Sequence, residues 1–373
     1  MSAAPIIVNL LTGFLGSGKT SLLRRLLREP DLADVAVLIN EFGEVGLDHL
    51  LLDKVDEDIV LLQSGCICCT IRGDLKEAML RLHGRIQRGE IPPVSRLVIE
   101  TTGLADPAPI VATLLVDPIL RHHFRLGNVV TLVDGVNGSE TLRRHEVSVK
   151  QAAVADRLVI SKIDLCGSVA ALRQELRRIN PAASIFEASE DAAAPVSLLL
   201  NDLHGETAKG AEVARWLSAE TADRANLGQD GHSHGAVAST CLIADAPIDW
   251  AGFGLWLSML LNRHGDRILR IKGLLNVAGV ESPVVIHGVQ HLIHKPVHLA
   301  DWPDGDSRTR IVVIADGLDL QAVRRSFEVF LGIGRAAAPH SPASRDMDVS
   351  YGGSQHAAGA LTAERDRQEH PWP

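Results

Sequence analysis

The chain has 373 residues, of which 46% are hydrophobic and 22% charged, fractions close to those of ordinary globular proteins. This composition excludes a wholly disordered chain and a collagen-like or coiled-coil fibre, and the formal net charge of -9 argues against a nucleic-acid partner. No basic region precedes an apolar run at the N-terminus, and the longest apolar stretch, residues 250–261, is too short to span a bilayer. We therefore expect a cytoplasmic protein with no nucleic-acid or membrane partner.

Short β-branched segments alternate with helical patterns through the first half of the chain. This alternation predicts an α/β fold, with a mostly parallel sheet and helices on both faces. We expect this domain to occupy residues 1–203. The predicted strands are Ile6–Leu11, Val35–Ile39, Ile59–Leu62, Arg96–Ile99, Val129–Val133 and Leu158–Ile160, and the predicted helices include Thr20–Arg28, Asp74–Arg88 and Ala170–Ile179.

The first predicted strand runs into a glycine-rich motif, GFLGSGKT, which fits the pattern G-x-x-x-x-G-K-[ST]. Glycines let the backbone wrap phosphates, so that successive N–H groups and the following helix N-terminus point at the anion. Lys19 can reach the β- and γ-phosphates, and the Thr20 hydroxyl can bind Mg²⁺. The predicted nucleotide-binding residues of this loop are Gly13, Gly16, Ser17, Gly18, Lys19, Thr20 and Ser21.

Two later motifs indicate which nucleotide binds. RLVIETTG places Glu100 at the C-terminal tip of a strand, where a carboxylate can hold Mg²⁺ through water or orient the attacking water. LVISKID places Ser161, Lys162 and Asp164 after a later strand. A carboxylate at Asp164 can accept from the N1–H and N2–H₂ groups of guanine, a donor pair that adenine lacks, so we expect GTP. Ser161 stands where asparagine is usual, and we expect its hydrogen bond to the phosphate loop to be weaker or water-mediated.

Three cysteines, Cys66, Cys68 and Cys69, lie within four residues of one another. Thiolates select soft or borderline ions such as Zn²⁺ and Cu⁺. Three thiolates leave a tetrahedral ion one ligand short, and an open site of this kind suits transfer of the ion. The fourth ligand could be a carboxylate, an imidazole or water. Glu41 and Glu44 in NEFGEVGLD are candidates for that ligand or for magnesium binding.

The second half of the chain predicts a linker and a smaller domain. Residues 204–239 are polar and form the expected flexible linker, in which His232 and His234 are expected to be solvated. Residues 240–335 predict a small α+β domain, and residues 336–373 a disordered tail. The predicted elements of the small domain are strands Cys241–Ala244, Arg267–Val277, Val284–Val289 and Ile311–Ala315, and helices Trp250–Arg263 and Asp319–Leu331.

Most side chains of the small domain are expected to be structural. Gly288 and Pro296 oppose a helix through the nearby histidines. We expect those histidines on a pair of strands, in structural or partner contacts: His287, His291, His294 and His298. Three basic residues are expected on a solvent-facing strand face, with docking of acidic client proteins as the alternative: Arg270, Lys272 and Arg310. The helix that begins at Trp250 is expected to be mostly core, with two side chains able to face a partner: Trp256 and Met259.

Taken in order, the motifs GFLGSGKT, NEFGEVGLD, GCICCTIRGDL, ETTGLADP and SKID resemble those of the CobW-type GTPases, P-loop proteins related to the urease and hydrogenase metallochaperone GTPases. The resemblance continues through RILRIKGLLNVAG, PVVIHGVQHLIHKPVHL and WPDGDSRTRIVVIADGLD, and it covers about residues 5 to 333. It implies GTP hydrolysis coupled to delivery of a metal ion, usually zinc, to a client metalloprotein. The sequence departs from the family at Ser161 and in its nearly absent histidine-rich linker.

Carried over by position, the resemblance implies that the three cysteines hold zinc. We expect Mg·GTP to order the loop that carries Glu41, Glu44 and Asp48, and hydrolysis to release it. The catalytic candidates are Lys19, Glu100 and Asp48. Cobalt supplied to corrinoid synthesis and a non-enzymatic zinc buffer or sensor remain alternatives, whereas a P-loop kinase is disfavoured because no acceptor-binding lid motif is visible. A homodimer and the identity of the client are left open.

Overall fold

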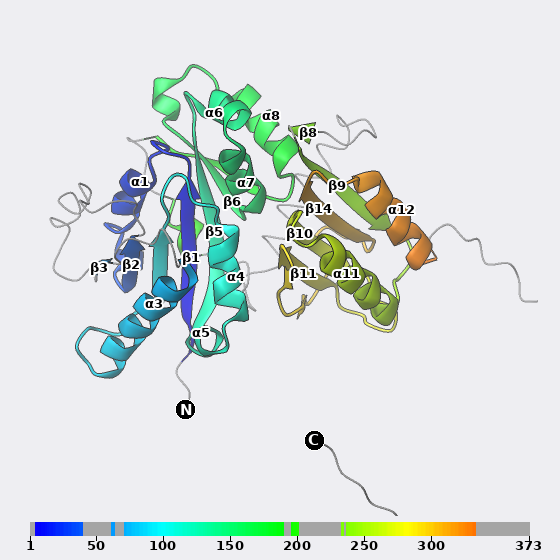
Figure 1. The fold of residues 1–373 in the computed structure, drawn as a ribbon, viewed down its shortest axis with the longest axis horizontal. Helices are drawn as coiled ribbons and strands as arrows, with labels where there is room; N and C mark the ends of the chain where they lie inside the picture. Colours follow the sequence, from blue (N-terminus) through cyan, green and yellow to red (C-terminus); the bar gives the residue numbers. More distant parts are fainter. Residues whose placement is uncertain are drawn as a thin grey trace, which may run out of the picture. The chain divides into compact units, whose positions relative to one another are not determined.

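The computed structural model describes residues 4–39, 61–63, 71–189, 195–200, 233–234 and 236–332. In this part of the chain, two seven-stranded sheets organise the fold (Figure 1). None of the described helices is long and apolar enough to cross a membrane.

The first sheet is parallel, with the strand order β3-β2-β4-β1-β5-β6-β7. Every residue of β2 and β6 is buried, as expected for strands covered on both faces. This confirms the predicted parallel sheet and adds β7, which the sequence analysis did not predict. The strands are β1 (Ile6–Gly13), β2 (Val35–Ile39), β3 (Leu61–Gln63), β4 (Arg96–Glu100), β5 (Phe124–Asp134), β6 (Arg157–Ser161) and β7 (Ser184–Glu187).

Helices cover both faces of this sheet, as predicted. One face packs against α1 (Lys19–Leu26) and α9 (Ser197–Leu200). In α8 the apolar residues Leu172, Leu176 and Ile179 recur at helical spacing and are buried, which explains why its predicted bounds are correct. The helices whose apolar side chains join the core on the other face are α3 (Ile71–Gln87), α4 (Ala108–Val116), α5 (Pro118–His123), α6 (Gly138–Arg144), α7 (Glu146–Val154) and α8 (Ala170–Ile179).

Of four neighbouring strands, β2, β3 and β4 end at the same level of the sheet, and β1 continues two residues farther, to Gly13. Gln63 of β3 pairs with Ile39 of β2, Ile39 pairs with Glu100 of β4, and Glu100 pairs with Leu11 of β1. Ligands of open α/β sheets bind beyond the carboxyl ends of the strands. The segments that follow β1, β2, β3 and β4 therefore all leave from the edge where a ligand is expected.

The second sheet is antiparallel, with the order β12-β11-β10-β14-β9-β8 and with β13 paired to β11. Apolar side chains of α11 (Trp250–His264) and α12 (Leu320–Phe330) pack on one face of it. This arrangement confirms the predicted α+β domain, although β9 begins four residues earlier than predicted. The strands are β8 (Ser233–His234), β9 (Val237–Ala244), β10 (Ile268–Leu275), β11 (Val284–Val289), β12 (Leu292–Ile293), β13 (Val297–His298) and β14 (Thr309–Asp316).

The four histidines of this domain follow the predicted strand pairing. His287 lies on β11 and His298 on β13, while His291 and His294 flank β12. The prediction that Trp256 could face a partner is wrong. Its ring is buried against Phe327, and its Nε1 donates to Ser326 Oγ at 3.1 Å. Met259, in contrast, is exposed.

The prediction that Arg270, Lys272 and Arg310 face solvent is also wrong, because all three are at least 95% buried. Arg270 forms an ion pair with Asp156, and Lys272 Nζ donates to the Ala182 carbonyl at 3.2 Å. Arg310 binds Asp304 at 2.9 Å. The physical reason is that this face of the second sheet joins the apolar core formed by the helices of the first.

Candidate functional site

The phosphate loop joins β1 to α1 and depends on glycine at its first position. Gly13 has a φ of 140°, and a Cβ atom there would lie 2.4 Å from the Leu132 carbonyl oxygen. Only glycine fits both the backbone conformation and the close approach of β5. The loop ends at Gly18, the left-handed N-cap residue of α1, so the first N–H groups of that helix open toward the loop. Gly16 and Ser21 are exposed to solvent.

The side chain of Lys19 lies across this loop. Its Nζ donates to the Gly13 carbonyl at 2.9 Å and to the Phe14 carbonyl at 3.1 Å, and the residue is buried. These carbonyls hold the ammonium beside the loop's N–H groups. A phosphate that enters the loop would meet a positive charge already in position.

Thr20 and Glu100 meet at the carboxyl ends of β1 and β4. The Thr20 hydroxyl donates to Glu100 Oε1 at 2.6 Å, and Glu100 is only 5% exposed. Beside them, Thr101 Oγ1 donates to Thr12 Oγ1 at 2.8 Å and ties the two strand ends together. Hydroxyl and carboxylate oxygens are the donors that Mg²⁺ prefers, so these two side chains fit that ion.

Ser161 braces the loop from the end of β6. Its hydroxyl donates to the Ser17 carbonyl at 2.7 Å, with the Val133 carbonyl farther away at 3.3 Å. The expected weak or water-mediated contact is therefore wrong. A direct bond forms because the last residue of β6 lies close enough to the loop for the short serine side chain to reach the Ser17 carbonyl.

Lys162 follows in a left-handed conformation, with a φ of 55°. Its Nζ binds Asp134 Oδ2 at 2.7 Å, while Asp134 Oδ1 accepts from the backbone N–H groups of Val136 and Asn137. Burial alone would raise the pKa of Asp134, but the bonds from Lys162 and the two amides outweigh it, so its pKa is held below the usual value. Asp164 lies exposed in the short 3₁₀ turn η2 (Ile163–Leu165).

Sequence reasoning missed Asp134. Its signal was the run VDG at the end of a predicted strand, since an acidic residue at a strand tip in a parallel sheet points to the ligand edge. At the same edge, the chain that follows β7 is fixed to α1, because Arg25 donates to the Ser189 carbonyl at 2.7 Å.

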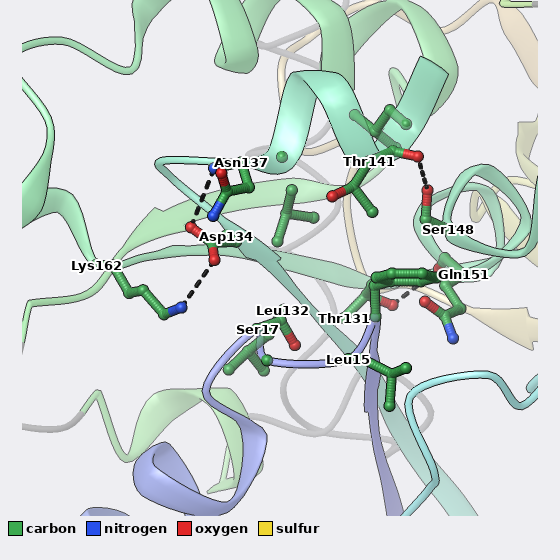
Figure 2. A pocket seen from close by; sticks show the side chains of 15 residues that line it. Leu15, Ser17, Thr131, Leu132, Asp134, Asn137, Thr141, Ser148, Gln151 and Lys162 are labelled. Atoms are coloured by element: carbon green, nitrogen blue, oxygen red, sulfur yellow. Dashed lines mark hydrogen bonds and ion pairs between the residues drawn. The ribbon is translucent and has the colours of Figure 1, made fainter. Parts of the chain in front are cut away.

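A cavity of about 230 Å³ opens between the phosphate loop and helices α6 and α7 (Figure 2). Phe14 and Leu15 line its loop side, and Thr131, Ser148 and Gln151 belong to its polar lining. The Ser17 hydroxyl and the carbonyl oxygen of the Gln151 side chain are buried in its wall, and neither forms a hydrogen bond with the part of the chain that the structure describes.

Six predicted site residues lie outside the described residues: Glu41, Glu44, Asp48, Cys66, Cys68 and Cys69. The first three follow Ile39, where β2 ends, and the cysteines fall between Gln63, where β3 ends, and Ile71, where α3 begins. Within the described ranges, no group of three histidine, cysteine, aspartate or glutamate side chains could hold a metal ion.

Two family models match the chain. Residues 7–187 match the CobW/HypB/UreG nucleotide-binding domain, and residues 237–331 match the cobalamin synthesis protein cobW C-terminal domain. The zinc chaperone YjiA of Escherichia coli is 33% identical over 87% of this chain and 98% of its own length. The zinc-regulated GTPase metalloprotein activator 1 of Schizosaccharomyces pombe is 36% identical, and the match covers 54% of this chain and 50% of that protein.

The fold has a matching solved structure. The crystal structure of Zn(II)-bound YjiA GTPase from E. coli superposes with a TM-score of 0.65 and 30% sequence identity, and the match covers 88% of this chain and 99% of that one.

Proposed function

The chain belongs to the CobW family, and from this premise we propose that it hydrolyses GTP and uses the nucleotide cycle to transfer zinc to a client metalloprotein. The observation that carries the proposal is the common edge at which β1, β2, β3 and β4 end. The phosphate loop and Glu100 lie on this edge, and the segments with the two glutamates and the three cysteines leave from it. The names of the relatives, zinc chaperone and zinc-regulated GTPase metalloprotein activator, agree with it.

Nucleotide binding uses the loop from Gly13 to Thr20. When GTP binds, the Lys19 ammonium would donate to the γ-phosphate in place of the Gly13 and Phe14 carbonyls. A charge-assisted bond to phosphate is stronger than a bond to a neutral carbonyl. Thr20 and Glu100 would hold Mg²⁺, which when bound neutralises charge on the phosphates. Glu100 would also orient the water that attacks the γ-phosphate.

Guanine recognition falls to the turn after β6. Ser161 fixes this turn to the phosphate loop through its bond to Ser17, and Lys162 is fixed by Asp134. The exposed carboxylate of Asp164 is then available to the N1–H and N2–H₂ groups of the base.

Zinc is the substrate that the protein carries, and Cys66, Cys68 and Cys69 would bind it as thiolates. Neighbouring strands lie about 4.8 Å apart, so β3, three strands from β1, ends about 14 Å from the phosphate loop. Glu41 or Glu44, which follow β2, the strand next to β3, would complete the zinc site or approach the Mg²⁺, and Asp48 belongs to the same segment. Free thiolates persist in a reducing compartment, which favours the cytoplasm.

Asp164→Asn tests the guanine assignment. An amide in place of the carboxylate can no longer accept from both guanine donors, so kcat/KM for GTP is expected to fall about ten- to a hundredfold. Xanthosine triphosphate, whose base carries a carbonyl where guanine has its amino group, is expected to become the better substrate. Phosphate release with both nucleotides measures this, with Asp245→Asn, the same change at an exposed residue just after β9, as the control. Unchanged selectivity between the two nucleotides would refute the role of Asp164.

A further inference from the structure

Helix α7 is bound to the loop that follows Glu100. Gln151 is a residue of α7, and its side chain is completely buried. Its Nε2 donates to the Gly103 carbonyl at 3.2 Å and to the Ala105 carbonyl at 2.9 Å. The backbone carbonyl of Gln151 accepts from Thr131 Oγ1 of β5 at 2.8 Å. One residue of α7 therefore holds both this loop and the central sheet.

The same loop is packed tightly on the phosphate loop. A Cβ atom at Gly103 would lie 2.5 Å from Leu15 N and 2.7 Å from Leu15 Cα. Such close backbone contact leaves no room for independent motion. If bound phosphates move residues 14–16, the chain around Gly103 must move with them. Gln151 then shifts as well, because its side chain is hydrogen-bonded to this loop.

The other end of α7 is bound to the second sheet. Arg270 of β10 donates to the Val154 carbonyl at 3.2 Å and forms a buried ion pair with Asp156. Asp156 Oδ2 also accepts from the backbone N–H of Val129 at 3.0 Å. Gln151 and Val154 are three residues apart, a single turn of helix, so a shift at one end is transmitted directly to the other.

We propose that α7 couples the nucleotide site to the second sheet, with Gln151 as the positioning residue. The inference rests on the nucleotide-binding part of the proposed function. The carbonyl oxygen of the Gln151 side chain lies in the wall of the cavity beside the phosphate loop, and it forms no hydrogen bond among the described residues (Figure 2).

The test compares Gln151→Met with Asn180→Leu. Both changes replace a fully buried carboxamide with an apolar side chain of similar shape. Asn180 Nδ2 binds the carbonyls of Ala152, Ala153 and Ala155 at the end of the same helix, but it does not touch the loop of Gly103. Gln151→Met is expected to lower kcat for GTP about ten- to a hundredfold, whereas Asn180→Leu lowers stability and leaves kcat within about twofold.

Backbone hydrogen exchange gives the second readout, measured in the native chain and in both variants with a non-hydrolysable GTP analogue and with GDP. In the native chain and in Asn180→Leu, the exchange rate at residues 268–275 of β10 is expected to differ between the two nucleotide states. In Gln151→Met, the exchange rate is expected to be the same in both states. Equal exchange in the native chain, or a difference retained in Gln151→Met, would overturn the proposal. These readouts do not involve zinc, so failure of the zinc assignment would appear separately, as unchanged zinc binding after loss of the cysteines.

Discussion

Replacement of Lys19 by alanine is expected to lower kcat/KM for GTP hydrolysis by about 10²- to 10³-fold. The Lys19 ammonium is held beside the loop by two carbonyls, and its charge is in place where negative charge develops on the transferring phosphoryl group. Steady-state phosphate release over a range of GTP concentrations measures the effect. The fold should be preserved, because the two carbonyls that lose Lys19 lie at the ligand edge, where water can replace it.

A lysine far from this loop provides the control. Lys76 of α3 forms an ion pair with Asp117 at 2.7 Å on the partly exposed side of the domain. Lys76→Ala removes the same charge and should leave kcat/KM within about twofold, since surface ion pairs contribute little. If Lys19→Ala keeps more than a third of the native kcat/KM, then this loop does not catalyse the reaction.

Arg270→Met is expected to cause the largest loss of stability, about 3–5 kcal/mol in the free energy of unfolding. Asp156 and Arg270 are both almost completely buried, so removal of the guanidinium takes from a buried carboxylate the charge that Arg270 supplies. The additional change Asp156→Asn should recover part of the loss, because the amide carries no charge and its oxygen can still accept from the Val129 N–H. Urea denaturation at neutral pH measures both variants.

Arg310→Met is the matched control for this prediction. Arg310 is buried on the neighbouring strand β14, but its partner Asp304 is about a quarter exposed, so water can solvate the carboxylate that remains. The loss is therefore expected to be smaller than that of Arg270→Met. Equal losses would show that burial of the pair does not determine the cost.

The parallel sheet and the phosphate loop could be predicted because their signals are local. A run of β-branched residues, a glycine pattern and apolar spacing in α8 are each read within about ten residues. The short strand β7 (Ser184–Glu187) was missed, since only one of its four residues is buried and it carries little apolar signal.

The partners of Arg270 and Lys272 could not be predicted in the same way. The alternation of apolar and polar residues around Arg270 and Lys272 correctly predicts a strand. It does not indicate whether the polar face of that strand contacts water or another domain. Asp156 lies 114 positions away in the sequence and the Ala182 carbonyl 90. Gln151 was missed for the same reason, because its role depends on a loop 46 to 48 residues before it.

Coupling between the nucleotide site and the zinc site is tested most directly by the affinity for Zn²⁺, measured by chelator competition. The measurement compares Mg·GTP analogue with Mg·GDP in reducing buffer, with Cys66→Ser/Cys68→Ser/Cys69→Ser as the control. We expect the two affinities to differ by about tenfold or more, equivalent to about 1.4 kcal/mol of coupling, and the difference to vanish in the control. Equal affinities in the two nucleotide states would contradict the account.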